Sequence, residues 1–325
     1  MKRTFDFLCQ GSVCTEILAW VDRYPNAGDA ILADPVKWTG GGMAANTAAA
    51  IALLGGRVAF VSAVGDDLYG SKAIASLQNI GVNVDFMIQH QNQPTPLVIL
   101  MINPSLQRAG LVLDMDEEFY LKNEDVPDNL IKTCKVFFTD MSAKNTSIEL
   151  TRRAKGLGLT TAFDMQMSEA HINSPNHDKK ICDIFELADF YFADEENFLN
   201  WTNAEDCTLG VSALLERYPD KTLVITKGSH GATITNVSEK IEVPAFDVPV
   251  VDTIGAGDAF HGAFLYAHII LCMSLRDSGM FASAVSAISC KKAGARDGLP
   301  TMNEVLDFLR ERKISVGLSF GGLPD

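Results

Sequence analysis

The residues of this chain best suited to chemistry lie in the segment 252–258, which reads DTIGAGD. An apolar stretch over residues 259–272 follows and predicts a buried helix. The start of such a helix presents backbone N–H groups and the positive end of the helix dipole, and both favour a bound phosphate. Asp258, in the first turn, can accept a proton from a hydroxyl, although its position also suits a helix-capping acid. A phosphate site and a base so close together favour phosphoryl transfer to an alcohol.

The turn itself is built from small residues. Because Gly255 and Gly257 have no Cβ, their backbone can approach a phosphate closely. We therefore expect Gly255, Ala256 and Gly257 to supply N–H donors to the transferred group.

Short apolar runs alternate with helical patterns along most of the chain and predict the elements that position this turn. The expected strands are residues 5–9, 58–64, 135–139, 160–164, 189–193 and 222–226. The expected helices are residues 43–54, 71–79, 146–157, 179–187, 208–217, 256–272, 277–293 and 303–312. This alternation predicts an α/β fold with a mostly parallel, doubly wound sheet that helices cover on both faces.

Two stretches, residues 13–39 and 94–113, do not follow this alternation. The second predicts two strands around an Asn103-Pro104-Ser105 turn. Taken by themselves, these stretches are consistent with a pair of ordinary antiparallel excursions from the sheet.

The amino-acid composition argues against some classes of binding partner. The formal net charge of −14 argues against nucleic acid or an anionic membrane, because both attract a basic face. The seven scattered cysteines suggest neither a disulfide framework nor a zinc site, and they suit a reducing compartment. No stretch is typical of a signal peptide or a membrane span. We expect a soluble cytoplasmic protein.

Five sequence blocks together resemble those of the ribokinase-like (PfkB-type) carbohydrate kinases. Residues 250–263 resemble the C-terminal signature of that family, and the GGGMAANTA stretch at 40–48 resembles its N-terminal signature. LGG at 54–56, VGDDLYG at 64–70 and VITKGSHG at 224–231 follow in the family's order. The order and spacing of the blocks are more specific than any one of them. The resemblance implies an ATP-dependent kinase for a small sugar or sugar derivative, with Asp258 as general base.

The resemblance also implies a sugar site in the N-terminal part of the chain. It places Gly41, Gly42 and Asn46 against the sugar, and the Asn46 amide can both donate to and accept from hydroxyls. Glu16 stands where such kinases usually carry Asp, and it either grips sugar hydroxyls or has a structural role. Arg108 either meets an anionic substrate group or is a solvated hairpin residue.

For the nucleotide, the resemblance implies Thr226, Gly228, Gly231, Asp252 and Thr253. Asp252 lies near the phosphates or a monovalent cation such as K⁺, or it holds the turn through an Asx bond.

We expect Asp194 and Asn197 to hold magnesium through bound water. Here the family's usual Asn-x-x-Glu is exchanged for Asp-x-x-Asn, which keeps one carboxylate and one amide at the same spacing. His261 is expected to be a packed helix residue without a catalytic role.

Two other functions remain open at this point. One is a nucleoside kinase of the same superfamily, and the other is a sugar-binding sensor without catalysis. Retention of Asp258 argues against the sensor.

The resemblance also implies a small discontinuous β lid formed by residues 13–39 and 94–113, over a core formed by residues 1–12, 40–93 and 114–325. An apolar minor sheet needs a cover, which a bound sugar or the lid of a second copy would provide. A homodimer formed through the lid is therefore a further expectation.

Overall fold

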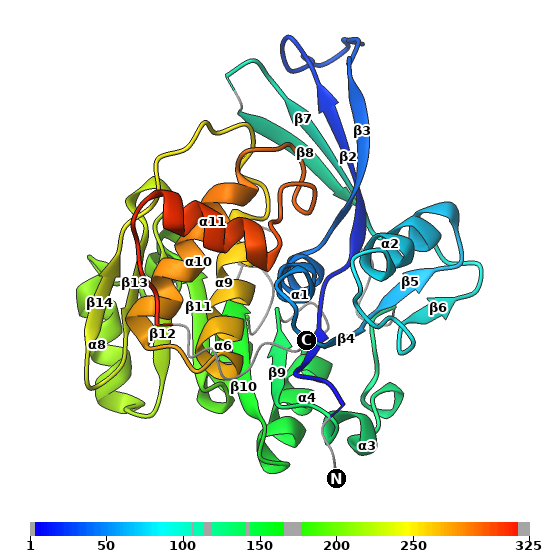
Figure 1. Ribbon diagram of the computed structural model, residues 1–325. Coiled ribbons are helices and arrows are strands. Elements are labelled where there is room, and N and C mark those ends of the chain that lie inside the picture. Colours follow the sequence, from blue (N-terminus) through cyan, green and yellow to red (C-terminus); the bar gives the residue numbers. More distant parts are fainter. Residues whose placement is uncertain (1–3, 106, 114–118, 141–143, 166–176, 318–325) are drawn as a thin grey trace.

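The structure is a computed structural model that describes residues 4–105, 107–113, 119–140, 144–165 and 177–317. It shows a layered body in which helices surround a large sheet, and a smaller sheet that projects from that body (Figure 1). Within the described residues, no helix is long and apolar enough to cross a membrane.

The large sheet has eight strands, and the first strand of the sequence is internal to it. Strands β1, β4 and β9–β12 are parallel, whereas β13 and β14 are added antiparallel at one edge. In spatial order the strands are β14 (Lys240–Val243), β13 (Ala232–Thr235), β12 (Thr222–Thr226), β11 (Phe190–Asp194), β10 (Thr160–Met165), β9 (Val136–Thr139), β1 (Phe7–Gln10) and β4 (Val58–Val61).

The projecting sheet joins two segments that are far apart in the sequence. Strand β2 pairs in parallel with β7, while β3 and β8 are antiparallel edge strands. In order, the strands are β3 (Val36–Gly41), β2 (Cys14–Trp20), β7 (Leu97–Ile102) and β8 (Arg108–Leu113). A third, two-stranded sheet pairs β5 (Ala63–Gly65) with β6 (Ile88–His90).

Helices pack on both faces of the large sheet. One face is covered by α1 (Met43–Leu53), α2 (Leu68–Gln78), α9 (Ala256–Leu265), α10 (Leu275–Ser289) and α11 (Met302–Glu311). The other face is covered by α3 (Asp128–Ile131), α4 (Asn145–Gly156), α6 (His177–Leu187), α7 (Glu195–Thr202) and α8 (Cys207–Arg217). Short turns of helix occur at η1 (Asn123–Asp125), η2 (Gly228–His230) and η3 (Tyr266–Ile270).

The double cover explains why the strands are apolar throughout rather than alternating. In β1, Phe7 and Cys9 belong to the apolar cluster on the α1 and α9 side, whereas Leu8 belongs to the cluster on the α3 and α4 side. Successive side chains of a strand point to opposite faces, so a strand that is buried on both faces needs apolar residues at every position. The predicted fold class is therefore confirmed.

The predicted elements are recovered, with several differences. The strand expected at 58–64 is divided into β4 and β5, and the structure adds elements that were not predicted, namely β6, β13, β14, α3 and α7. The helix expected at 256–272 ends as α9 at Leu265 and continues in the wider η3 turn. The two irregular stretches do form the projecting sheet, although β3 extends to Gly41, beyond the lid boundary expected at residue 39. The division of the chain into a core and a lid domain stays a prediction.

Candidate active site

Helices α1 and α9 approach each other closely, and this contact determines where Asp258 lies. Helix α1 is rich in buried alanine, and Gly262 of α9 faces it. A Cβ on Gly262 would lie 2.7 Å from the Thr47 carbonyl oxygen, so glycine is what permits the approach. Thr47 Oγ1 also donates a hydrogen bond to the Asp258 carbonyl oxygen at 3.3 Å. The first turn of α9 is thereby placed directly beside α1.

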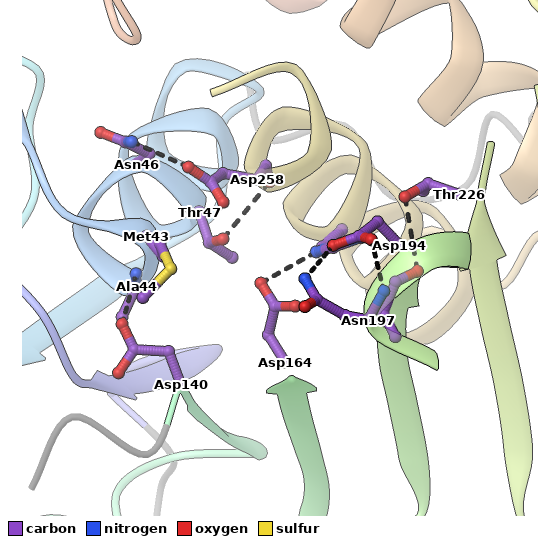
Figure 2. A network of polar contacts seen from close by, with 12 residues as sticks. Met43, Ala44, Asn46, Thr47, Asp140, Asp164, Asp194, Asn197, Thr226 and Asp258 are labelled. Atoms are coloured by element: carbon purple, nitrogen blue, oxygen red, sulfur yellow. Dashed lines mark hydrogen bonds and ion pairs between the residues drawn. The ribbon is translucent and has the colours of Figure 1, made fainter. Parts of the chain in front are cut away.

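Asp258 and Asn46 meet at this contact. The Asn46 Nδ2 donates to Asp258 Oδ2 at 2.8 Å, and both side chains are buried (Figure 2). On its other side, Asn46 Oδ1 accepts a hydrogen bond from Arg296 Nε at 2.9 Å. The structure therefore brings together the expected base and one expected sugar-binding residue.

The DTIGAGD segment forms the turn expected before α9. Gly255 is the N-cap residue with φ of 74°, and no side chain of the described residues caps this helix. The Ala256 N–H donates to the Thr253 carbonyl oxygen at 3.3 Å, so it already has a partner within the turn. Asp252 stabilises the turn, because its Oδ1 accepts from Ile254 N at 3.0 Å. Its Oδ2 accepts from Gly294 N at 2.8 Å.

Glu16 extends from β2 toward the same region and is only 7% exposed. A Cβ on Gly41 would overlap the Glu16 carboxylate, so the glycine makes room for the acid. The Glu16 Oε2 has no hydrogen-bond partner among the described residues. Burial raises the pKa of Glu16 to about 7; the positive charge of Arg296 opposes this rise, whereas Asp258 adds to it. A buried carboxylate oxygen without a donor suits a ligand that brings hydroxyl groups.

Two basic residues of the projecting sheet contact the main body. Arg108 of β8 donates to Thr253 Oγ1 and lies 3.6 Å from Asp252 Oδ1. Lys37 of β3 donates to the Ala293 carbonyl oxygen at 2.9 Å. A cavity of about 170 Å³ lies at this junction, with Arg108, Asp252 and Thr253 in its wall. Arg108 therefore contacts the DTIGAGD turn through a partly exposed side chain, and its role in binding stays a prediction.

The expected magnesium pair lies at the carboxyl end of β11. Asp194 caps α7: its Oδ1 accepts from Asn197 N at 2.9 Å, and its Oδ2 accepts from Asn197 Nδ2. The described residues contain no cluster of three or more His, Cys, Asp or Glu side chains able to hold a metal ion. The carboxylate oxygens of Asp194 keep lone pairs beyond their bonds to Asn197, so these two residues fit Mg²⁺ held through water.

Three of the five expected nucleotide residues lie at the neighbouring strand end, and the other two, Asp252 and Thr253, belong to the turn before α9. Thr226 ends β12, and its Oγ1 donates to the Ala193 carbonyl oxygen at 3.4 Å (Figure 2). Gly228 and Gly231, with φ of 55° and 89°, bound the η2 turn. A Cβ on Gly231 would overlap the Val243 carbonyl oxygen, so this glycine is required by close packing as well as by φ.

His261 is buried, as predicted, but it also forms an ion pair. Its Nδ1 lies 3.0 Å from Asp164 Oδ2, at the carboxyl end of β10. Burial is the largest single influence and lowers the pKa of His261. The charge and hydrogen bond of Asp164, together with the charges of Asp258 and Asp194, outweigh burial, so the net shift of this pKa is upward. The pair lies next to the first turn of α9, since a Cβ on Gly257 would be 3.9 Å from His261 Cε1.

Sequence reasoning missed three polar residues of this region. Asp140 accepts from Ser12 N at 2.9 Å and from Ala44 N at 3.1 Å, so it joins β1 to the start of α1. Asp140 and Asp164 had a usable signal, because each stands at the end of an apolar strand, where ligands of α/β folds bind. Arg296 follows α10 in a loop and had no such signal.

Comparison with known proteins identifies the class. Residues 6–302 match the model of the pfkB family of carbohydrate kinases, so the chain belongs to this family of phosphotransferases. It is 30% identical to fructokinase-1 of Oryza sativa subsp. japonica over 83% of this chain and 88% of that protein. It is 27% identical to ribokinase of Bacillus subtilis over 92% of this chain and 97% of that protein.

A solved structure supports the same fold. The fructokinase of Xylella fastidiosa with bound ATP superimposes with a TM-score of 0.81 at 24% identity, over 96% of this chain and 100% of that one. The predicted family and the predicted kinase class are confirmed.

Proposed function

We propose that this carbohydrate kinase transfers the γ-phosphoryl group of ATP to a hydroxyl of a small sugar or sugar derivative, with Asp258 as the general base. The observation that carries the proposal is the place of Asp258 in the uncapped first turn of α9, one residue after the glycine turn and in contact with Asn46. Asp258 accepts the proton of the attacking hydroxyl as the oxygen bonds to phosphorus.

The sugar is proposed to bind between β2 and α1. Glu16 Oε2, which lacks a donor, accepts hydrogen bonds from sugar hydroxyls, and Asn46 contacts a further hydroxyl. Gly41 and Gly42 bring the backbone close to the ligand because neither has a Cβ. Arg108 closes the site from the lid side through its contacts with Asp252 and Thr253. Water that would compete as the acceptor is thereby excluded.

The phosphates are proposed to lie along the glycine turn. Gly255 and Gly257 donate N–H groups to the transferred phosphoryl group, and Ala256 does so after releasing its bond to Thr253. Asp252 and Thr253 lie toward the phosphates, and Asp252 is also the proposed contact of a monovalent cation such as K⁺. Further along the nucleotide lie Thr226, Gly228 and Gly231. The ATP named with the Xylella fastidiosa fructokinase supports this nucleotide.

Magnesium is proposed to bind at Asp194 and Asn197 through water. When bound, it neutralises charge on the phosphate oxygens. The carboxylate of Asp194 retains lone pairs beyond its two bonds to Asn197, so it can still accept from metal-bound water.

Asp258→Asn tests the proposal. The amide is nearly isosteric but cannot accept the proton, so we expect kcat to fall by about 10²–10⁴ while ATP affinity is retained. ADP release should be measured with fructose, ribose, ribose 1-phosphate and adenosine as acceptors. A fully active Asp258→Asn enzyme contradicts the assignment of the base. Turnover with adenosine alone supports a nucleoside kinase, and no acceptor-dependent ADP release supports a sensor.

We further propose a homodimer that forms through the lid in the cytoplasm. The support for the dimer is apolar surface on the lid, where Val36, Trp38, Leu111, Val112 and Leu113 are exposed. The cytoplasmic location rests on the scattered cysteines of the sequence alone.

A further inference from the structure

Arg296 is a buried cation to which the proposed reaction gives no role. It is 6% exposed and lies in the loop after α10. Its guanidinium makes three hydrogen bonds: Nε to Asn46 Oδ1 at 2.9 Å, Nη1 to Ser76 Oγ at 2.6 Å, and Nη2 to the Gly41 carbonyl oxygen at 2.6 Å. Burial lowers the pKa of Arg296 to about 10, so the group stays protonated at neutral pH. One side chain therefore joins α1, α2 and the end of β3.

The contact with Asn46 has a consequence for the base. An asparagine amide has unlike ends, of which the oxygen only accepts and the nitrogen only donates. Arg296 can only donate, so it holds the Asn46 oxygen and turns the nitrogen toward Asp258 Oδ2 at 2.8 Å. If the amide turned over, its oxygen would face the carboxylate of Asp258, and two acceptors would repel each other. Arg296 thus selects the orientation in which Asn46 donates to Asp258.

The Arg296 side chain also contacts the end of β3, a strand of the proposed lid. A Cβ on Gly40 would overlap the guanidinium, and the Gly41 carbonyl oxygen accepts from it, so Arg296 fits closely against the end of β3. The next residue, Asp297, accepts from Thr39 Oγ1 at 3.1 Å and pairs with Lys37 at 3.2 Å. A movement of β3 therefore reaches Arg296 directly.

We propose that Arg296 is a positioning residue for phosphoryl transfer, which acts through Asn46 to hold Asp258 and couples this pair to the lid strand β3. The proposal rests on the proposed role of Asp258. It predicts an effect on turnover and on its pH dependence that a residue needed only for folding would not have.

The first test compares Arg296→Lys and Arg296→Met with wild type. Lysine keeps the charge but cannot reproduce the three-way contact, and methionine removes both. We expect kcat to fall by about 10- to 100-fold in Arg296→Met, the effect of losing a hydrogen bond to a charged group, and by less in Arg296→Lys. The acid limb of the kcat profile should move to higher pH, because Asp258 loses a fixed donor that favours its carboxylate form, and because Glu16 loses the nearby positive charge that lowers its pKa. The KM for ATP should be unchanged.

Ser76→Ala is the matched control. It removes one of the three contacts of Arg296 but leaves those to Asn46 and Gly41, so kcat should stay within about twofold of wild type. Thermal unfolding of every variant shows whether it is folded. If Arg296→Met does not fold, Arg296→Lys serves in its place.

A double-mutant cycle with Asn46→Ala tests the route of the effect. If Arg296 acts through Asn46, its substitution should lower kcat little further once Asn46 is absent. Fully additive effects overturn the proposal, and so does wild-type kcat with an unmoved pH profile in a folded Arg296→Lys or Arg296→Met enzyme. If one of these overturning results is obtained while Asp258→Asn is inactive in the same assays, the role of Arg296 fails but the proposed function stands. If Asp258→Asn is fully active, the proposed function itself fails.

Discussion

Glu16 is a buried acid whose environment differs from that of an ordinary surface acid. Burial raises its pKa from the ordinary value of 4.5 to about 7, against the opposing charge of Arg296. The unfolded chain releases this proton near pH 4.5, whereas the folded chain keeps it until near pH 7. Over this interval the folded state binds more protons, so the free energy of unfolding contributed by Glu16 falls as pH rises.

Glu16→Gln should remove this pH dependence. The amide cannot ionise, so the free energy of unfolding of wild type relative to Glu16→Gln should decline by about 1–3 kcal/mol between pH 4.5 and pH 7, and then stay level. Urea unfolding without sugar, at several pH values, measures the difference. Parallel curves for the two proteins across this interval would show that the carboxyl of Glu16 ionises as it does in water.

Glu16 also bears on substrate binding. Only the carboxylate accepts hydrogen bonds at both oxygens, so Glu16→Gln should raise the KM for the sugar more at pH 8 than at pH 6. A KM that is the same in both proteins at both pH values assigns Glu16 a purely structural role.

At single positions, the sequence predicted best where a residue acts through its local backbone. The sequence predicted a glycine turn before a buried helix with Asp258 in its first turn, and in the structure α9 begins at Ala256 directly after Gly255. Arg296 could not be found in this way. Its partners Gly41, Asn46 and Ser76 lie more than 200 positions earlier, and no local pattern requires a cation there.

Among the elements, the packing of α9 on α1 is the contact on which the proposed site depends. Gly262→Ala should place a methyl group 2.7 Å from the Thr47 carbonyl oxygen and 3.3 Å from Ala50 Cβ. The helices must separate, which should cost about 1–3 kcal/mol of stability. It should also lower kcat, because Asp258 moves away from Asn46.

Gly156→Ala is the matched control for that change. Gly156 is also helical, but a Cβ there meets no atom within 4 Å. This substitution should be neutral or stabilising by up to about 1 kcal/mol, since alanine loses less backbone entropy on folding. Denaturant unfolding and kcat should be measured for both variants. Equal stability and turnover of the two would mean that α1 and α9 do not pack as described.

The boundaries of elements were less predictable than their order. Apolar strands and amphipathic helices give a local signal, and all six strands expected in the large sheet are present. The parallel pairing of β2 with β7 gives no local signal in the sequence, because it joins Thr15 to Leu97 across the intervening helices. The sequence indicated two irregular stretches but could not show that they share one sheet.

For the molecule as a whole, the uncovered lid is the feature that predicts association. Strand β8 is an edge strand, and Leu111, Val112 and Leu113 are exposed along it. Val112→Lys places a charge on this edge, which disfavours pairing with another copy. Sedimentation should therefore show a dimer for wild type and a monomer for Val112→Lys.

Leu209→Lys provides the control for the lid. Leu209 is 55% exposed, against 68% for Val112, but it lies on α8 of the main body. Leu209→Lys should therefore leave the molecular mass of the protein in solution the same as that of wild type. A monomeric wild-type protein, or a dimer that survives Val112→Lys, contradicts association through β8.

The internal position of β1 has a consequence for how the chain folds. Its residues pair with Val58–Val61 on one side and with Val136–Thr139 on the other. As the chain leaves the ribosome, β1 emerges first, yet one of its edges has no partner until β9 has been made. Long-range pairing of this kind is slow and leaves an apolar strand edge open to other chains. The central sheet therefore cannot be completed progressively from β1 onward, and nascent chains that pause before residue 139 leave the edge of β1 that faces β9 unpaired.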